Sequence, residues 1–504
     1  MWTVLILILS IIYLIYLWYT RKYDYFEKRG YPAVKARFPL GNTPNGFLNK
    51  RNVLYDFEDL YNQFRGKEPL IGYFEAKTPR YLVISPEVAK KVMITNFSNF
   101  HDNEFSLLFN KDIEPMIGRN PFVLAGQEWK EKRSQITPAF SNNRLRACFP
   151  LVEEVLTRFT KYIKNEYKKD KKAPLELREI CARYTTDVVS SCVFNADAQS
   201  FTKENSEIRA MGKKFVEALS SFGLVQFLLT SLFPGIQKLL KMRIMDKKSE
   251  DFFINLMLQA VKLRESSKIQ RDDYLSFLIE LRKKKSISDI EMAAHGVTFF
   301  SDGFETSSIG ISHILYELAG SENSQQKLRK EISETIIDEN GKIVYENMLE
   351  NEYLNQVFYE ALRLHQPLGI YNRECTEAIN LDCGNGKVFK IEKGMGINIP
   401  IHCFHRDPEY YTNPNEFIPE RFDPENGGIK AFQDRGVLAP FGDGPRICLG
   451  KRFAQIQVKA AIVDIIRNFE LSINEKTQRP LTIEPNHLLN VKVGGLWINV
   501  KPFK

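Results

Sequence analysis

The sequence predicts a mainly α fold with minor β sheet, in which a single large helix-rich domain follows an N-terminal transmembrane helix. Three observations lead to this prediction. Between about residues 150 and 375, apolar residues recur at spacings of three and four and Gly and Pro are sparse, as in amphipathic helices. Short alternating stretches at 80–84 and 396–401 are typical of strands. The first 19 residues are almost entirely apolar.

Residues 1–20 are predicted to anchor the chain in a membrane. Only Thr3 and Ser10 are polar between Met1 and Tyr19, and a helix of this length spans about 28 Å, enough to cross a bilayer core. A cleavable signal peptide is the alternative, but the apolar run has no basic segment before it and no small-residue cleavage site after it. Basic residues follow directly at 21, 22, 28 and 29, which favours a cytosolic location for the rest of the chain.

Residues 21–50 are predicted to form a basic, stiff connector, because Pro32, Pro39 and Pro44 interrupt helix formation. Residues 51–504 are predicted to form one domain. A chain of 504 residues would on average hold about three domains. However, no low-complexity linker and no repeat of fixed period divides this part of the sequence.

Charge and cysteine content narrow the class of protein. The net charge of +8 comes partly from basic runs at 168–172 and 282–285, which are usually solvated loops. No nucleic-acid-binding motif accompanies them, so we expect an acidic protein partner or anionic lipid rather than DNA or RNA. The seven cysteines are odd in number and none has another within four residues. This spacing excludes a zinc finger and favours free thiols in a reducing compartment.

The segment Phe441–Gly450 concentrates the chemistry of the sequence on one cysteine. Gly442, Gly444 and Gly450 specify a tight loop whose backbone N–H groups are free to point at the Cys448 sulfur. Those donors, together with Arg446, favour the thiolate, which is the form that binds metals. The residues from 449 onward are predicted to begin a helix, with its positive end near the sulfur. The alternative is a glycine-rich turn around a buried free cysteine.

Two further segments combine residues that are unusual in helices. The stretch 294–308 carries an acid, Glu305, beside an alcohol, Thr306, and has a glycine at 303 that costs a helix about 1 kcal/mol. A threonine bonded back to its own helix carbonyl is the alternative interpretation. Further along, Glu360 and Arg363 stand three residues apart on a predicted helix, which on its own indicates only a surface ion pair.

The cysteine loop resembles the haem-binding signature of the cytochromes P450, Phe-x-x-Gly-x-Arg-x-Cys-x-Gly. Phe441, Gly444, Arg446, Cys448 and Gly450 fill all five fixed positions. The resemblance extends over essentially the whole chain. It implies the cytochrome P450 fold and haem b as cofactor, with the Cys448 thiolate as the axial ligand of the iron.

The resemblance also implies roles for other residues. Thr306 would lie over the iron and, with Glu305, organise protons for oxygen activation. The side chains expected to reach the haem propionates are Trp129, Arg133, Arg373 and Arg446. The residues expected to form a buried structural triad are Glu360, Arg363 and Arg421. The apolar stretch 222–234 is too short to span a membrane. It is either a buried helix or part of a loop that dips into the membrane at the substrate entrance.

By the same resemblance, the protein is a monooxygenase that inserts one atom of O2 into a hydrophobic xenobiotic or endogenous lipid. Electrons would come from NADPH through a cytochrome P450 reductase, with cytochrome b5 as a possible second partner, because the chain has no dinucleotide-binding loop. Segments 303–308 and 371–376 are most similar to insect microsomal members, which implies the endoplasmic reticulum membrane. A haem-thiolate isomerase, a non-catalytic membrane haem protein and a cofactor-free membrane scaffold are the alternatives.

Asp302 departs from the family pattern, which has Ala or Gly at this position. Helical spacing puts His295, Phe299, Asp302 and Thr306 on one stripe, which would line the oxygen side of the haem. An ionised carboxylate in a dry pocket is costly. The sequence therefore predicts either a pocket with more water than usual or substrates with a basic nitrogen.

Overall fold

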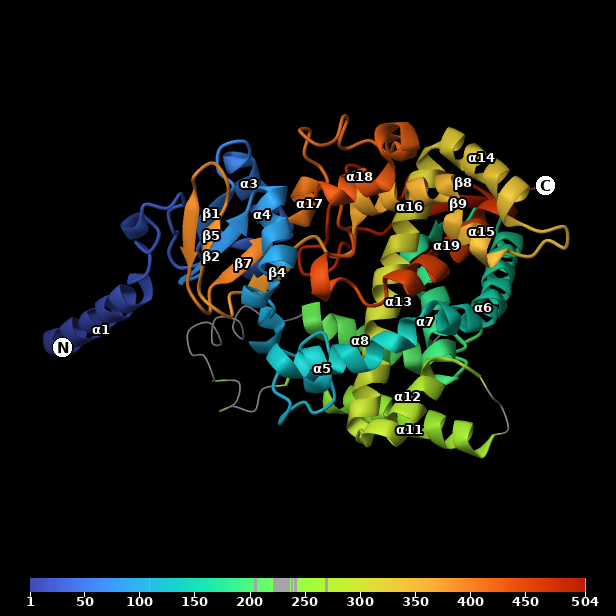
Figure 1. The fold of residues 1–504 in the computed structure, drawn as a ribbon, viewed down its shortest axis with the longest axis horizontal. Helices are drawn as coiled ribbons and strands as arrows, with labels where there is room; N and C mark the ends of the chain where they lie inside the picture. The colour runs from blue at the N-terminus through green and yellow to red at the C-terminus, as the bar shows by residue number, and fades with distance from the viewer. Residues whose placement is uncertain are drawn as a thin grey trace.

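The computed structural model describes residues 1–107, 109–203, 206–220, 236, 239, 243–267 and 271–503, and segment 222–234 lies outside them. The fold is helix-rich, as predicted, and a body of packed helices makes up most of the molecule (Figure 1). The helices are α1 Trp2–Thr20, α2 Asn45–Leu48, α3 Leu54–Phe64, α4 Pro86–Lys90, α5 Gly126–Ile136, α6 Asn142–Lys169, α7 Leu177–Phe194, α8 Glu207–Ser220, α11 Lys247–Ser266, α12 Tyr274–Lys285, α13 Asp289–Gly320, α14 Glu322–Glu331, α15 Tyr345–Glu350, α16 Glu352–His365, α17 Ile401–Phe404, α18 Gly428–Asp434 and α19 Lys451–Asn468.

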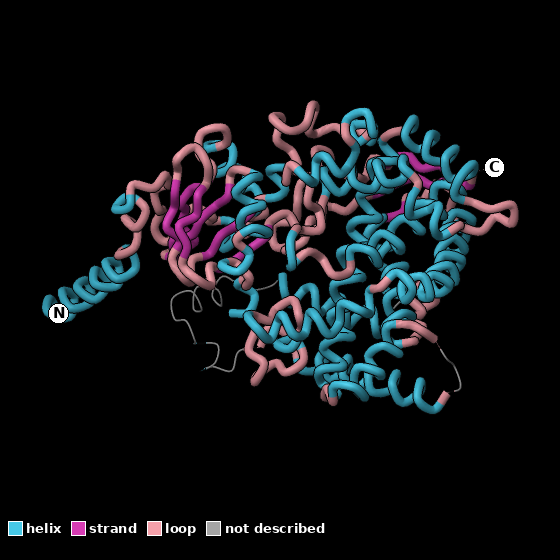
Figure 2. Tube along the Cα trace, in the orientation of Figure 1, coloured by secondary structure: helices cyan, strands magenta, loops and turns pink. Residues whose placement is uncertain are grey.

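The strands form small sheets, and Figure 2 shows the main group beside the N-terminal helix and a second group near the C-terminus. The strands are β1 Leu70–Glu75, β2 Thr78–Val83, β3 Leu175–Glu176, β4 Tyr371–Glu374, β5 Ile379–Asp382, β6 Val388–Ile391, β7 Gly396–Ile399, β8 Phe469–Ile473 and β9 Trp497–Pro502. The sheet orders are β1-β2-β7-β4, β3-β9-β8 and β5-β6. Both strand predictions are confirmed, except that β7 ends at Ile399 and residues 401–404 turn into α17.

Helix α1 is apolar and long enough to cross a membrane, with a mean hydropathy of 2.1, and its side chains are almost all exposed. It projects from the body of the protein (Figure 1). Its C-terminal end nevertheless packs against the connector. Tyr19 donates a hydrogen bond to the Pro39 carbonyl at 2.5 Å, and the rings of Tyr16 and Tyr19 contact that of Phe38. The connector in turn pairs with the main sheet, because Val34 N–H donates to the Gly72 carbonyl.

Helix α13 runs through the centre of the helical body (Figure 1). It begins at a capping box in which Ser288 and Glu291 satisfy each other's backbone N–H groups. Its glycines have a packing reason. A Cβ atom at Gly303 would lie 3.3 Å from Val189 of α7, and one at Gly296 would lie 2.1 Å from Met257 of α11. These glycines let α7 and α11 approach α13 closely, which offsets their cost to the helix.

The predicted triad of Glu360, Arg363 and Arg421 is present and buried. The Glu360 carboxylate accepts from Arg363 at 2.8 Å and from Arg421 at 2.9 Å, and the side chains of Glu360 and Arg363 are fully inaccessible to solvent. Arg363 also donates to the carbonyls of His405 and Pro414. The triad therefore ties α16 to the long irregular segment that precedes Cys448.

Glu360→Ala should destabilise the protein by about 3–5 kcal/mol, because it leaves two guanidinium groups without their shared carboxylate in the interior. The measurement is the midpoint of urea denaturation of the full chain in detergent. Glu420→Ala is the matched control, since Glu420 pairs with Lys327 on the surface, where the two side chains are 41% and 47% exposed. It should cost at most about 1 kcal/mol. Equal effects of the two substitutions would contradict a structural role for the triad.

Candidate active site

The cysteine loop runs from Phe441 to a single turn of 3₁₀ helix, Gly444–Arg446, and ends at the start of α19. The Cys448 N–H donates to the Phe441 carbonyl at 2.9 Å and closes the loop. Gly444 has φ +69°, and a Cβ atom there would lie 2.0 Å from the Met93 carbonyl oxygen. Only glycine fits this position, because the backbone conformation and the close approach both exclude a side chain.

Cys448 is exposed to the inside of a cavity, which is itself enclosed by the protein. Burial raises its pKa to about 11, and the Asp302 charge adds to this increase. The Gly450 backbone N–H, Arg133 and Lys451 oppose the increase, because each of them favours the thiolate. Helix α19 begins at Lys451, so its positive end is near the sulfur, as the sequence predicted. A bound metal ion would add the largest charge at this point and deprotonate the thiol.

One cavity brings together every residue for which the sequence predicted a catalytic or cofactor-binding role. The cavity lies between α13 and the cysteine loop and is lined mainly by aromatic and aliphatic side chains. From the loop and its surroundings it receives Phe441, Arg446, Cys448, Trp129, Arg133 and Arg373, and from α13 it receives Glu305 and Thr306. Residues that are more than 300 positions apart in the sequence thus share one apolar enclosure. This is the form of a site for a small molecule or cofactor.

Three arginines line this cavity at the cysteine side. Arg446 donates to the carbonyls of His101 and Leu124, and it lies 4.1 Å from the centre of the Trp129 ring. Arg133 donates to the Ile447 carbonyl at 2.6 Å, beside Cys448. Arg373 donates to the Asn372 carbonyl, while its buried Nε has no hydrogen-bond partner among the described residues.

The three guanidinium groups are short of negative charge. Burial, followed by repulsion from Arg373, lowers the pKa of Arg446 to about 9, although Asp102 pairs with it at 3.3 Å. Burial also lowers the pKa of Arg373 to about 10 and that of Arg133 below its usual range. A ligand with two carboxylates would relieve this repulsion and satisfy the Arg373 Nε. The propionates of haem have the required charge and geometry for bidentate pairing.

The acid and the alcohol of α13 have different surroundings. Thr306 Oγ1 lies in the cavity wall and donates to the Asp302 backbone carbonyl at 2.5 Å. Thr306 therefore bonds back to its own helix, as in the alternative interpretation of the sequence, but its side chain also faces the cavity. Glu305 is buried and forms an ion pair with Arg178 of α7, with Arg178 Nε 3.0 Å from its Oε1.

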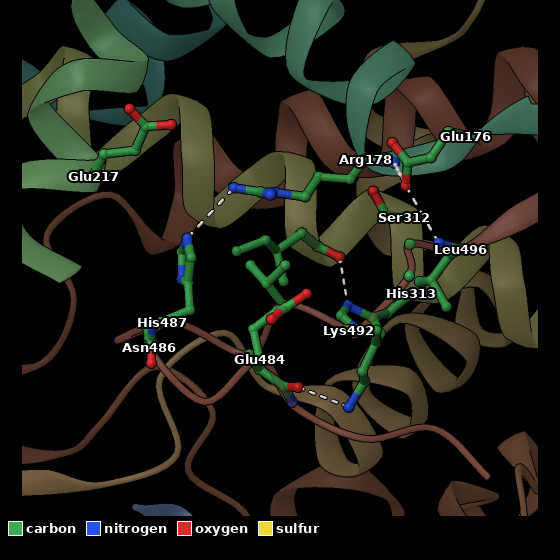
Figure 3. Close-up of a pocket in the computed structure, with 15 residues that line it drawn as sticks. Glu176, Arg178, Glu217, Ser312, His313, Glu484, Asn486, His487, Lys492 and Leu496 are labelled. Carbon is green, nitrogen blue, oxygen red and sulfur yellow. Dashed lines mark hydrogen bonds between the residues drawn. The ribbon is translucent and has the colours of Figure 1, made fainter. Parts of the chain in front are cut away.

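Arg178 connects the first cavity to a second one. The second cavity lies further along α13 and is lined by polar side chains, including Glu176, Arg178, His313, Glu484, His487 and Lys492. Figure 3 shows the Arg178 guanidinium extended across this cavity to within hydrogen-bond distance of His487. Glu305 lines the first cavity and Arg178 the second. Their ion pair therefore lies between the two cavities.

Sequence reasoning missed Arg178 and placed one residue wrongly. Nothing in the sequence near residue 178 points to Glu305, which is 127 positions away. The helical stripe of His295, Phe299, Asp302 and Thr306 is only partly a cavity wall. Its last three members line the cavity, but His295 is buried elsewhere, with no partner for either ring nitrogen among the described residues. The predicted position of His295 is wrong because this part of α13 is packed against other helices. Tyr274 of α12, for example, donates to the His295 carbonyl.

The family model and the similar proteins all indicate the same family. The cytochrome P450 family model matches residues 45–498. Probable cytochrome P450 28d1 of Drosophila melanogaster is 36% identical over 500 residues, which cover 99% of this chain and 98% of the relative. Probable cytochrome P450 28a5 of the same species is 34% identical, with coverage of 99% and 98%. Cytochrome P450 6a2 from this fly is 33% identical, with coverage of 99% and 100%.

The chain therefore belongs to the cytochrome P450 family. It is a P450 monooxygenase, a class that binds haem through a cysteine thiolate and works with redox partners and hydrophobic substrates. The cavity fits this cofactor in three respects: a cysteine at a helix N-terminus, an apolar enclosure, and three arginines that need anionic partners.

Gly444→Ala should lower the free energy of unfolding by more than the cost of its left-handed backbone conformation alone. Gly428→Ala is the matched control, because Gly428 has φ +66° but no atom within 4 Å of its Cβ position. Its cost should be about 1–2 kcal/mol, from left-handed strain. Gly444→Ala must in addition move the cysteine loop away from Met93. Thermal unfolding and haem content should both separate the variants, and equal values would contradict the crowded-loop explanation.

Proposed function

We propose that this protein is a microsomal monooxygenase that inserts one atom of O2 into hydrophobic small molecules, either xenobiotics or endogenous lipids. The observation that carries the proposal is the single apolar cavity that has Cys448 on one wall and Glu305 with Thr306 on another. The cofactor would be haem b. Thiolate-ligated haem supplies the oxygen activation and C–H oxidation chemistry when bound.

The residues of the chain hold the cofactor and manage protons. Cys448 is the proposed iron ligand, and Arg133, Arg373, Arg446 and Trp129 are the proposed contacts to the propionates. Phe441 lines the cavity beside the cysteine and helps to exclude water. The Thr306 hydroxyl directs its own proton to the Asp302 carbonyl, which leaves the lone pairs of its oxygen able to accept a hydrogen bond from a water molecule in the cavity. Glu305 holds a negative charge next to it, with Arg178 as counter-ion.

Electrons would come from NADPH through a membrane-bound cytochrome P450 reductase, with cytochrome b5 as a second donor. Exposed basic residues support a docking face for such acidic partners. Lys130 of α5 and Arg452 of α19 are both exposed and lie on the two helices that flank the cysteine loop. Opposite charges on two proteins speed their encounter. The apolar α1 and the basic residues after it support a single-pass location in the endoplasmic reticulum membrane, with the catalytic domain in the cytosol.

Cys448→Ser should abolish the thiolate-type Soret band of the reduced CO complex, because a serine hydroxyl does not replace the thiolate as an electron donor. The measurement is a reduced-plus-CO difference spectrum of the haem-loaded full chain. Cys383→Ser is the control, since Cys383 is a buried free cysteine away from the cavity. A thiolate-type spectrum that persists in Cys448→Ser would show that another residue binds the iron.

Thr306→Val should reduce product formation by about tenfold or more, because positioned proton donors and acceptors contribute at least that much. NADPH consumption should fall less, so the ratio of product to NADPH should drop. Thr298→Val is the matched control. Thr298 also lines the cavity from α13 and donates to its own i−4 carbonyl, at 2.7 Å. If both substitutions lower the ratio equally, or neither does, Thr306 has no special role in proton delivery.

A further inference from the structure

One acid in the wall of the cavity has no cation beside it among the residues described above. The charged residues of the wall are Arg133, Arg373, Arg446, Glu305 and Asp302. Glu305 is neutralised by Arg178. Asp302 has a hydrogen bond from the Ser301 hydroxyl, at 3.1 Å from its Oδ1, and no ion-pair partner among the residues that the structure describes. Within the described part of the chain, a negative charge on Asp302 is therefore not compensated.

The surroundings of Asp302 make that charge costly. The side chain is open to the cavity but enclosed by protein, and burial raises the pKa of its carboxyl to about 7. Phenylalanine rings dominate the lining, at positions 105, 109, 122, 140 and 299. A carboxylate in such a place needs a partner with a positive charge.

The three arginines of the cavity do not supply that partner. Arg133 and Arg446 are held at the cysteine side by the Ile447, His101 and Leu124 carbonyls. The two propionates of haem would take up the guanidinium groups that remain short of negative charge. No cation of the described wall is then left for Asp302, and a cationic molecule that enters the cavity would supply one.

We propose that Asp302 binds the cationic group of the substrate, and that the substrates are hydrophobic amines that carry a positive charge at neutral pH. The carboxylate pairs with the ammonium group, and the phenylalanine rings bury the apolar body and add cation–π contacts. The inference rests on the proposed monooxygenase function and specifies its substrate class. Asp302 is one helical turn before Thr306, so a bound ammonium would hold neighbouring carbon atoms near the oxygen-activating side of the cavity.

The test compares two ligands of the same shape, N-benzyl-N-methylpiperidinium and the neutral compound in which carbon replaces its nitrogen. The piperidinium is permanently charged and has no lone pair with which to bind iron. Dissociation constants are measured by equilibrium dialysis against the haem-loaded full chain in detergent. The wild type should bind the piperidinium at least as tightly as the neutral compound, although water solvates the cation far better.

Asp302→Asn should weaken binding of the piperidinium by about 30-fold, the low end for removal of one partner of a buried charge pair. Binding of the neutral compound should stay unchanged. Asp302→Glu keeps the charge and should retain most of the preference for the cation. Glu484→Gln is the control for loss of a negative charge nearby, because Glu484 lines the second cavity rather than the first (Figure 3).

Two results would overturn the proposal. The first is a wild type that does not bind the piperidinium, which would mean that Asp302 is satisfied by extra water in the cavity. The second is an Asp302→Asn variant in which the ratio of the two dissociation constants changes by less than about fivefold, the range of an exposed ion pair. Dialysis does not depend on turnover, and the CO spectrum of the same preparation tests the haem-thiolate assignment. Failure of the substrate class is thus distinguishable from failure of the proposed function.

Discussion

The buried carboxylate of Glu360 organises the part of the chain that ends at the cysteine loop. It binds Arg363 and Arg421 and accepts the Ile418 N–H, and Arg363 in turn holds the His405 carbonyl. His405 then uses its ring, because its Nε2 accepts the Ala439 N–H at 3.1 Å, two residues before Phe441. Tyr371 donates to the Ala439 carbonyl from the other side. A chain of hydrogen bonds thus runs from Glu360 in α16 to Ala439, two residues before the loop begins. A largely irregular segment, whose regular structure is limited to short helices, needs such anchors to keep a single conformation.

Positive and negative side chains lie on different sides of the cavity beside the cysteine loop. Positive groups gather at the Cys448 side, where burial lowers the pKa of Arg133, Arg373 and Arg446, and the other two arginines lower that of Arg446 further. Negative groups lie on α13, where Glu305 has a cationic partner and Asp302 has none in the described parts of the chain. The arrangement matches a cofactor with two carboxylates on one side and an incoming cation on the other. Under the proposed function, cofactor binding and substrate selection are then separate electrostatic problems on different walls of the same enclosure.

The parts of the site that lie within short sequence motifs could be predicted from the sequence. The contacts between residues far apart in the chain could not. The cysteine loop could be read from five residues because its glycines, arginine and cysteine act within ten positions. The Glu360–Arg363 pair lies on one helix, and the family resemblance supplied Arg421. In contrast, Arg178 reaches Glu305 across 127 positions, and the His405 ring reaches Ala439 across 34. Helical spacing correctly placed Phe299, Asp302 and Thr306 on one face, but it gave no information about where the cavity ends, which is why His295 was misplaced. The alternating sequence pattern likewise gave no sign that β7 ends at Ile399 and that α17 follows.

The contact between α1 and the connector has a kinetic consequence. Tyr19 is bonded to Pro39, and the rings of Tyr16 and Tyr19 pack on Phe38, so the last turn of the anchor is fixed to the body of the protein. A flexible tether would let the domain tumble at the membrane surface and sample every orientation. On the proposal that α1 spans a membrane, the docked helix would remove most of those orientations. Diffusion in the plane of the bilayer would then be the main search between this protein and a membrane-bound partner, and their effective concentration would be that of a thin layer rather than of the surrounding volume.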